Sequence, residues 1–210
     1  MEDVLEVYSR PYDEQQPVVC VDEASKQLVA DVTPPVPMRT GQPAREDYEY
    51  ERRGTANLFM ACEPLAGRRQ VKVTQRRTLN DFAHLLRDLS DVHYPHAETI
   101  VLVMDNLNTH KLSVLYGAFP PREARRLYER FEVHHTPKHA SWLNVAECEL
   151  SALGRQCLAR RIDNPALLER EVQAWVASRN GQTVRIDWQF TTADARIKLK
   201  RLYPLLSPEN

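Results

Sequence analysis

Two aspartates follow apolar stretches that are typical of β-strands. Asp22 comes after "VVCV" and Asp105 comes after "IVLVM". In α/β sheets, ligands bind where the strands end, so acids at two such ends are candidates for chemistry. Aspartate is also common in turns, and either residue alone would equally fit a strand-end turn. The pair therefore indicates a functional site only if a further group joins it.

A third carboxylate, Glu147, falls on a predicted helix over 142–159. At about 100° per residue, Glu147 lies within an apolar face made of Leu143, Ala146, Leu150, Leu153, Gly154 and Cys157. Glu149 lies about 200° away from Glu147, so we expect it to point away from that face. A buried, unpaired carboxylate is unfavourable unless a cation binds it. Three such acids offer the hard oxygen ligands that magnesium prefers.

Two other interpretations of these residues stay open at this stage. Glu147 could pair with an arginine such as Arg155 or Arg160 instead of binding a metal. Alternatively, zinc could be bound by His134, His135, His139 and Cys148. Adjacent histidines on a strand point to opposite faces, however, and the spacing fits no common zinc pattern.

The elements that must position the acids have a mixed α/β order. We expect strands at 17–24, 26–32, 56–64, 69–75, 98–105 and 131–137, with the first two forming a hairpin. We expect helices at 78–94, 122–131, 142–159, 164–179 and 191–202. An antiparallel meander followed by strand–helix units predicts a mixed sheet flanked by helices.

The composition sets limits on the class of protein. The 210 residues are 42% hydrophobic and 27% charged, which suits one globular domain with its own core. The net charge of -1 means that any nucleic-acid binding must rely on local basic patches. The four cysteines form no CxxC pair and are interpreted as thiols in a reducing compartment. No apolar run approaches the ~20 residues of a membrane span, and no signal peptide is visible, so we expect a cytoplasmic protein.

Three blocks of the sequence resemble the catalytic blocks of DDE transposases. They are "VVCVDE", "VLVMDNLNTHK" and "HHTPKHASWLNVAECELS". The most similar branch is that of bacterial insertion sequences within the mariner-like superfamily. Segments 41–59 and 179–199 also resemble that branch, so the resemblance covers nearly the whole chain.

The resemblance implies an RNase H-like fold and a catalytic, metal-binding triad of Asp22, Asp105 and Glu147. Two Mg²⁺ or Mn²⁺ ions would support DNA strand cleavage and strand transfer at insertion-sequence ends. The implied partners are those ends, target DNA and a second copy of the chain in an active homodimer, at the bacterial nucleoid and away from membranes. Four further positions match the motifs near the site: Asn106, His110, His139 and Asn144. The alternatives are a catalytically incompetent transposase fragment and another RNase H-like nuclease.

The resemblance also divides the chain into segments. We expect an N-terminal helix and linker over 1–16, the catalytic domain over 17–203 and a tail over 204–210. No counterpart of the family's N-terminal helix-turn-helix region is expected ahead of Asp22. The stretch 115–130 lengthens the spacing between the second and third acids beyond that of typical mariner relatives.

Basic residues gather in the region 52–77 and predict a DNA-binding surface. They are Arg52, Arg53, Arg68, Arg69, Lys72, Arg76 and Arg77. The alternative is a solvated charged face. Trp142, just ahead of the predicted catalytic helix, is expected to be a buried anchor for that helix rather than a platform for DNA bases.

Overall fold

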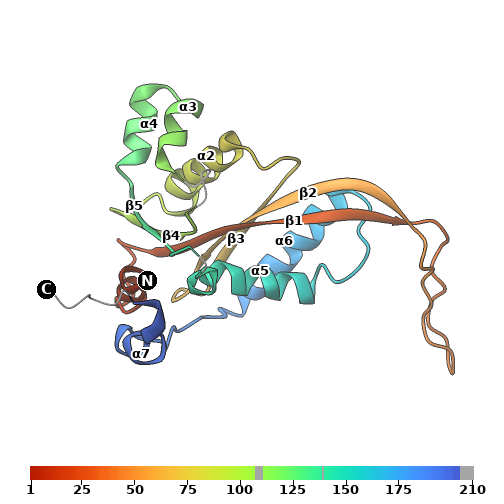
Figure 1. Ribbon diagram of the computed structural model, residues 1–210. Helices are drawn as coiled ribbons and strands as arrows, with labels where there is room; N and C mark the ends of the chain where they lie inside the picture. Colours follow the sequence, from red (N-terminus) through yellow and green to blue (C-terminus); the bar gives the residue numbers. More distant parts are fainter. Residues whose placement is uncertain (107–110, 139, 204–210) are drawn as a thin grey trace, which may run out of the picture.

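A five-stranded sheet in the order β3-β2-β1-β4-β5 runs through the protein (Figure 1). The computed structural model describes residues 1–106, 111–138 and 140–203. β1 pairs antiparallel with β2, and β2 pairs antiparallel with β3, whereas β1, β4 and β5 are parallel. The predicted mixed α/β class is therefore confirmed. The strands are β1 (Val18–Asp31), β2 (Tyr50–Glu63), β3 (Arg68–Thr74), β4 (Ile100–Met104) and β5 (Phe131–His135).

Each face of the sheet carries its own hydrophobic core, because successive side chains of a strand point to opposite faces. Cys20 and Met60 belong to the core beneath α5 and α6, and Val21 and Phe59 belong to the core beneath α2. Helices therefore cover both faces of the sheet (Figure 1). Those on the first face are α5 (Val145–Gln156) and α6 (Pro165–Gly181); those on the second are α2 (Leu79–Asp88), α3 (Leu115–Ala118) and α4 (Pro121–Tyr128).

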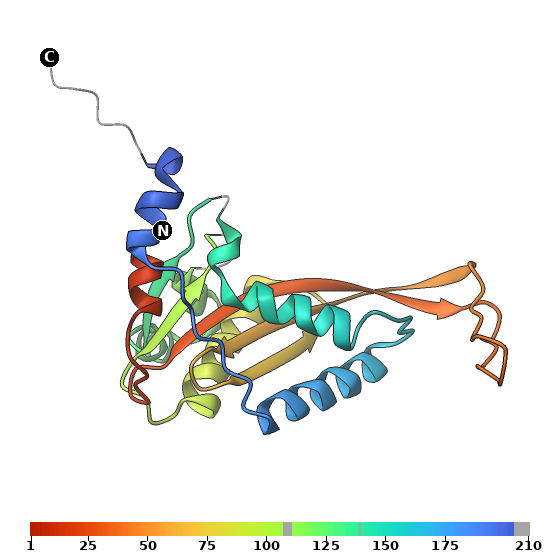
Figure 2. The same cartoon turned by 90° about the horizontal axis from the view of Figure 1, so that it is seen from below.

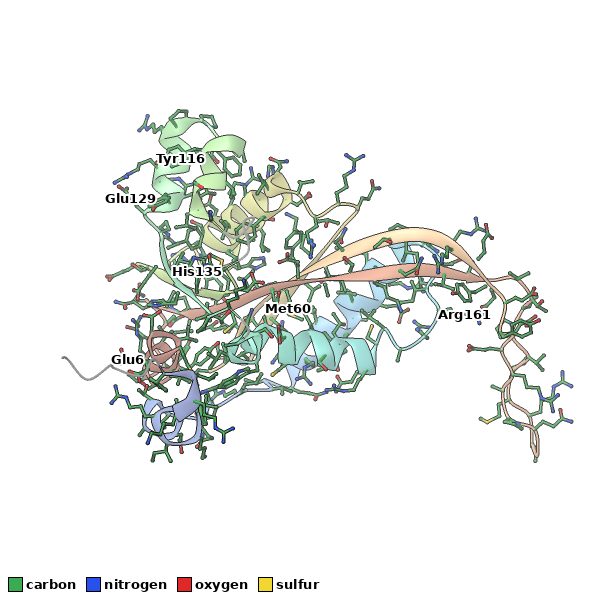
Figure 3. The ribbon with its side chains drawn as sticks, in the orientation of Figure 1. Glu6, Met60, Tyr116, Glu129, His135 and Arg161 are labelled. Carbon is green, nitrogen blue, oxygen red and sulfur yellow. The ribbon has the colours of Figure 1, made fainter. Side chains whose placement is uncertain are left out.

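β1 and β2 are each 14 residues long and continue beyond the other strands as a two-stranded arm (Figures 1 and 2). Their register runs from Cys20 opposite Cys62 to Asp31 opposite Tyr50. Arg161 forms an ion pair of 2.6 Å with Asp31, the last residue of β1, at the far end of the two paired strands (Figure 3). The arm is therefore a continuation of the central strand β1 and of its neighbour β2.

The prediction of a hairpin between 17–24 and 26–32 is wrong, because both segments belong to the single strand β1. The polar residues between them suggested a turn, but each finds a partner within extended structure. The hydroxyl of Ser25 donates to Oδ1 of Asn57 at 2.7 Å, and Nζ of Lys26 donates to the carbonyl of Leu158 at 2.7 Å. Polar groups that are satisfied in this way do not interrupt a strand.

The predicted helices are present, and side chains cap the first turns of three of them. Thr78 and Asp81 form a capping box at the start of α2, and α2 continues as a π-helical turn over Leu89–His93. Asn164 caps α6, and Thr191 caps α7 (Thr192–Lys198). These side chains accept hydrogen bonds from N–H groups that have no partner within the helix.

The N-terminal helix α1 (Glu2–Tyr8) is part of the domain rather than a separate linker element. Val4, Leu5 and Val7 are buried in the same core as α5 and α6. α1 packs on α7, and an ion pair of 2.7 Å joins Glu2 to Arg196. The predicted boundary at residue 17 therefore cuts through the core. The predicted tail, 204–210, lies outside the described residues.

No helix in the described part of the chain has the length and apolar character needed to cross a membrane.

Candidate active site

The parallel pairing of β1 with β4 brings Asp22 and Asp105 to the same level of the sheet. Cys20 lies opposite Val103, and each chain segment reaches its aspartate two residues later. Because alternate residues of a strand share a face, Asp22 lies on the face of Cys20, which α5 covers. The prediction that Asp22 ends its strand is wrong, since β1 continues as the arm, whereas β4 does end directly before Asp105.

Asn144 places the start of α5 next to Asp22. Its Oδ1 accepts a hydrogen bond from the N–H of Ala146 at 3.1 Å, and its Nδ2 donates to the carbonyl of Val21 at 3.0 Å. The side chain is buried. Asn144 therefore caps the helix and also ties it to the residue before Asp22, one helical turn ahead of Glu147.

Tyr8 of α1 supports the same helix start, and the sequence held no signal for this role. Its hydroxyl donates to the carbonyl of Leu143 at 2.7 Å and accepts a longer bond, of 3.4 Å, from the N–H of Val145. Burial raises the pKa of Tyr8 above its usual value, so the hydroxyl stays protonated and remains a donor. Tyr8 belongs to a short acidic segment, and such a segment is typical of a linker.

The double role of Asn144 leads to a prediction about stability. Asn144→Ala should lower the free energy of unfolding by about 2–3 kcal/mol, because it removes both a helix cap and a buried bond to the sheet. Asn164→Ala is the matched control, since Asn164 caps α6 through one bond to Leu167 and is exposed. The control should lose about 1 kcal/mol. Equal losses in urea unfolding would contradict the anchoring role.

The pKa of Asp22 is raised to about 6, chiefly by burial of its carboxyl group. A hydrogen bond from the N–H of Glu23 to Oδ1, at 2.8 Å, acts in the opposite direction. The negative charges of Asp105, Glu23 and Glu147 add to the rise. The carboxylates of Asp105 and Glu147 thus both act on Asp22, from a neighbouring strand end and from the covering helix.

This raised pKa predicts that Asp22→Asn stabilises the metal-free protein. The folded-state pKa of about 6 exceeds the usual value of 3.8, so the folded state holds the Asp22 proton more tightly than the unfolded state. The ionised carboxyl therefore destabilises the fold fully above pH 6, and this effect disappears as the pH falls towards 4.

We expect Asp22→Asn to gain about 1–2 kcal/mol at pH 8 in EDTA, after allowance for solvent screening, and to lose this advantage near pH 4. Urea unfolding of both proteins at the two pH values is the measurement. A variant less stable than the parent at pH 8 would contradict the prediction.

The three predicted carboxylates do not form a closed metal site in the described part of the chain. Within residues 1–106, 111–138 and 140–203, no three histidine, cysteine, aspartate or glutamate side chains are grouped so as to hold an ion. The zinc interpretation gains no support from His134, whose ring nitrogens contact Asp3 at 2.8 Å and Glu132 at 2.7 Å. Nδ1 of His135 lies 3.2 Å from the carbonyl oxygen of Asp105.

The structure places only some of the other residues that were predicted to lie near the site. Asn106 follows Asp105 directly and is exposed. His110 and His139 lie outside the described residues. The alternative partners of Glu147 are engaged elsewhere, since Arg155 donates to Ser151 and Arg160 pairs with Glu171 at 2.6 Å. Glu147 is half-buried and has no arginine partner in the described part of the chain.

A comparison with protein families agrees with this arrangement. The model of the family described as DDE superfamily endonuclease matches residues 17–168, a span that holds Asp22, Asp105 and Glu147. The chain belongs to this family. A search of curated proteins found no match to this DDE endonuclease.

Solved structures of the Mos1 transposase share the fold of the DDE endonuclease. A Mos1 mariner paired-end complex with Mn has 18% identity and a TM-score of 0.55, covering 86% of this chain and 55% of that one. A Mos1 strand transfer complex has 14% identity and a TM-score of 0.57, covering 86% and 54%. A Mos1 paired-end complex with the left transposon end has 17% identity and a TM-score of 0.55, covering 87% and 56%. The chain thus spans slightly more than half of their length, and its RNase H-like fold is established.

In this DDE endonuclease, Glu149 rather than Glu147 is the most buried acid of α5, contrary to prediction. Only 1% of Glu149 is exposed. Its carboxylate lies 2.9 Å from Nε of Arg69 on β3 and 2.9 Å from Nη2 of Arg179 on α6. α5 is covered on two sides, by the strands and by α6. Glu149 lies outside the apolar face that packs on the strands, but it is buried against α6.

The predicted DNA-binding residues of the DDE endonuclease do not form one surface. Arg69 is 1% exposed and cannot contact DNA; its guanidinium also donates to the carbonyls of Gly67 and Val184. Lys72 pairs with Asp88 at 2.6 Å. Arg68 starts β3, and Arg77 follows its far end, 3.3 Å from Glu23.

The other basic residues of the predicted DNA-binding set remain candidates for DNA contacts. Arg52 and Arg53 lie exposed on the arm, where Arg53 pairs with Glu51 at 2.7 Å. Arg76 is exposed after the end of β3. Arg77 contacts Glu23, whose side chain points to the face of the sheet opposite that of Asp22.

Trp142 is not the buried anchor that the sequence predicts. It lies in the 3₁₀ turn Ser141–Leu143 directly before α5, and 41% of it is exposed. The anchoring is done by Leu143, which is fully buried, and by Asn144. The Trp ring therefore lies at the surface beside the start of the helix that carries Glu147.

Proposed function

We propose that this chain is the catalytic domain of a transposase, which cuts DNA strands at insertion-sequence ends and joins them to target DNA. Asp22, Asp105 and Glu147 are the proposed catalytic residues. The observation that carries the proposal is the placement of the three acids: the parallel register of β1 and β4 sets Asp22 and Asp105 at one level of the sheet, and Asn144 ties the start of the helix with Glu147 to the residue before Asp22. The raised pKa of Asp22, caused chiefly by burial and in part by the other two carboxylates, supports it. An arrangement that holds acids together against their repulsion is typical of a site that binds cations.

The chemistry of the donor set fits Mg²⁺ or Mn²⁺. All three side chains offer carboxylate oxygens, which are the ligands these ions prefer. The Mos1 paired-end structure was determined with Mn, and two ions of this class are our proposal for this chain. When bound, such ions would activate the attacking oxygen and stabilise the leaving oxygen of a phosphodiester.

The residues of the chain supply position and charge. Asp22 gives up its proton near pH 6 and is therefore an anionic ligand at neutral pH. Asn144 and Tyr8 fix the first turn of α5, which is the turn that carries Glu147. Holding the reacting phosphate and its ligands in register lowers the barrier without any covalent enzyme intermediate.

The proposed partners are DNA and a second copy of the chain. The similar Mos1 structures are described as paired-end and strand transfer complexes, and they motivate a homodimer acting on insertion-sequence ends. The exposed arginines Arg52, Arg53 and Arg76 would contact the phosphate backbone.

The test is a nicking assay on supercoiled plasmid DNA. We expect nicked product with Mg²⁺ or Mn²⁺ and none in EDTA, and we expect joining of a labelled oligonucleotide 3′-hydroxyl to the plasmid. Absence of nicking with both metals would favour an incompetent fragment. Faster cleavage of an RNA–DNA hybrid than of the plasmid would favour another RNase H-like nuclease.

A further inference from the structure

Four aromatic rings form a ladder that leads from the core to the surface beside the proposed site. Tyr8 contacts Trp188, with ring centroids 5.1 Å apart. Trp188 stacks on Trp142 at 6.2 Å and an interplanar angle of 19°. Phe190 meets the Trp142 ring edge-on at 5.7 Å. Trp142 is the outermost member and stays 41% exposed.

The ladder packs against the Trp142 ring from two sides. Trp188 and Phe190 belong to the segment between α6 and α7, which crosses from one helix to the other (Figure 2). Nε1 of Trp188 donates to the carbonyl of Phe190 at 2.8 Å and fixes that segment locally. Tyr8 is itself bonded to the start of α5. A large apolar ring held in place but left open to solvent is suited to binding another flat, apolar surface.

The position of the ring indicates what that surface is. Trp142 lies five residues before Glu147. At the rise of a helical turn this is about 8–10 Å, or about three nucleotides of a DNA strand. Cations lie nearby: Lys138 is exposed in the preceding turn, and Nζ of Lys198 lies 5.5 Å above the Phe190 ring. An aromatic platform flanked by cations has the chemistry of a single-strand DNA site.

We propose that Trp142 stacks on an unpaired nucleobase within about three nucleotides of the phosphate that the carboxylates hold. This inference rests on the proposed function and names the form of its substrate, a locally single-stranded DNA end. Stacking tolerates any sequence, because every base has a π-face. The ring would hold the strand in place next to Glu147 and would take no part in the reaction itself.

The experiment measures binding rather than cleavage. The probes are a fluorescein-labelled twelve-nucleotide oligo-dT and a blunt, fully paired duplex of the same length, titrated in EDTA. Trp142→Ala should weaken oligo-dT binding about 5-fold or more, as expected for the loss of one stacked base. Binding of the duplex should change less than about 2-fold, within what sequence-independent phosphate contacts provide. Trp142→Phe should keep most of the affinity, whereas Trp142→Leu, which is apolar but not aromatic, should not.

Tyr116→Ala is the matched control. Tyr116 is 46% exposed on α3 and packs on another aromatic ring, Tyr128, but it lies on the other side of the sheet (Figure 3). Its loss should leave both affinities unchanged. A thermal melt of each variant accompanies the titrations, and the Phe and Leu variants carry the test if Trp142→Ala melts early.

Three outcomes would overturn the inference. They are an equal effect of Trp142→Ala on both probes, equal affinities of the Phe and Leu variants, and a change of oligomeric state with unchanged oligo-dT binding, which would assign the ring to a second copy of the chain. Because the readout is binding, a parent protein that binds oligo-dT through Trp142 but nicks no DNA would overturn the proposed function alone.

Discussion

Glu149→Gln is expected to lower the free energy of unfolding by about 3–5 kcal/mol. The substitution keeps the shape of the side chain and removes only its charge. Arg69 and Glu149 are both almost fully buried, and Arg179 contacts the same carboxylate. Removing the acid leaves the Arg69 guanidinium buried without its counter-charge, which is far more costly than losing a surface pair.

The matched control for this prediction is Glu129→Gln. Glu129 pairs with Arg125 at 2.6 Å on α4, but both side chains are more than half exposed (Figure 3). An exposed pair of this kind contributes little to stability, so this variant should unfold close to the parent. Urea unfolding of the parent and both variants gives the comparison. A loss below about 1 kcal/mol for Glu149→Gln would mean that solvent reaches Arg69.

The second large effect is on catalysis. Asp105→Asn and Glu147→Gln should each reduce metal-dependent plasmid nicking at least about 10³-fold, because each removes an anionic ligand that the reaction requires. Both variants should stay folded, since each substitution keeps the shape of the side chain and neither residue is fully buried. The rate is measured per folded molecule at saturating Mg²⁺ and at saturating Mn²⁺.

Glu149→Gln again provides the contrast, because it lies two residues from Glu147 on the same helix. Assayed well below its melting temperature, it should keep nicking within about 10-fold of the parent, because it removes no metal ligand. Loss of nicking in Glu149→Gln together with retention in Glu147→Gln would exchange the roles of the two acids and overturn the proposed triad.

The fold and the order of the acids were predictable because they depend on local patterns. The apolar run before Asp105 gave β4, and the helical period gave α5 with Glu147 in it. The prediction that Glu149 is exposed was wrong because a helical period identifies only one apolar face. α5 packs on the strands and also contacts α6, so a second side of the helix is buried. The prediction that Arg69 binds DNA was wrong because its charge suggested a surface position. Its buried partner, Glu149, is distant in sequence and could not be foreseen.

Two further errors have different physical causes. Trp142 is large and apolar, so burial was the natural expectation, but the neighbouring Leu143 fills the core instead. The role of Tyr8 was not predicted because α1 is short and one side of this helix is acidic. The other side of α1 is buried. In each case tertiary contacts decide between two positions that the sequence makes equally plausible.

The parallel pairing of β1 with β4 also has a consequence for the order of folding. β1, β2 and β3 are neighbours both in sequence and in the sheet, so their antiparallel ladders close the shorter loops. β4 reaches β1 only after the chain has passed through β2, β3 and α2, and α5 must then return to cover Asp22. Contacts between distant segments form late because they close large loops. We therefore expect the elements that carry Asp22, Asp105 and Glu147 to come together late in folding, so that the proposed site is completed only in the nearly native chain.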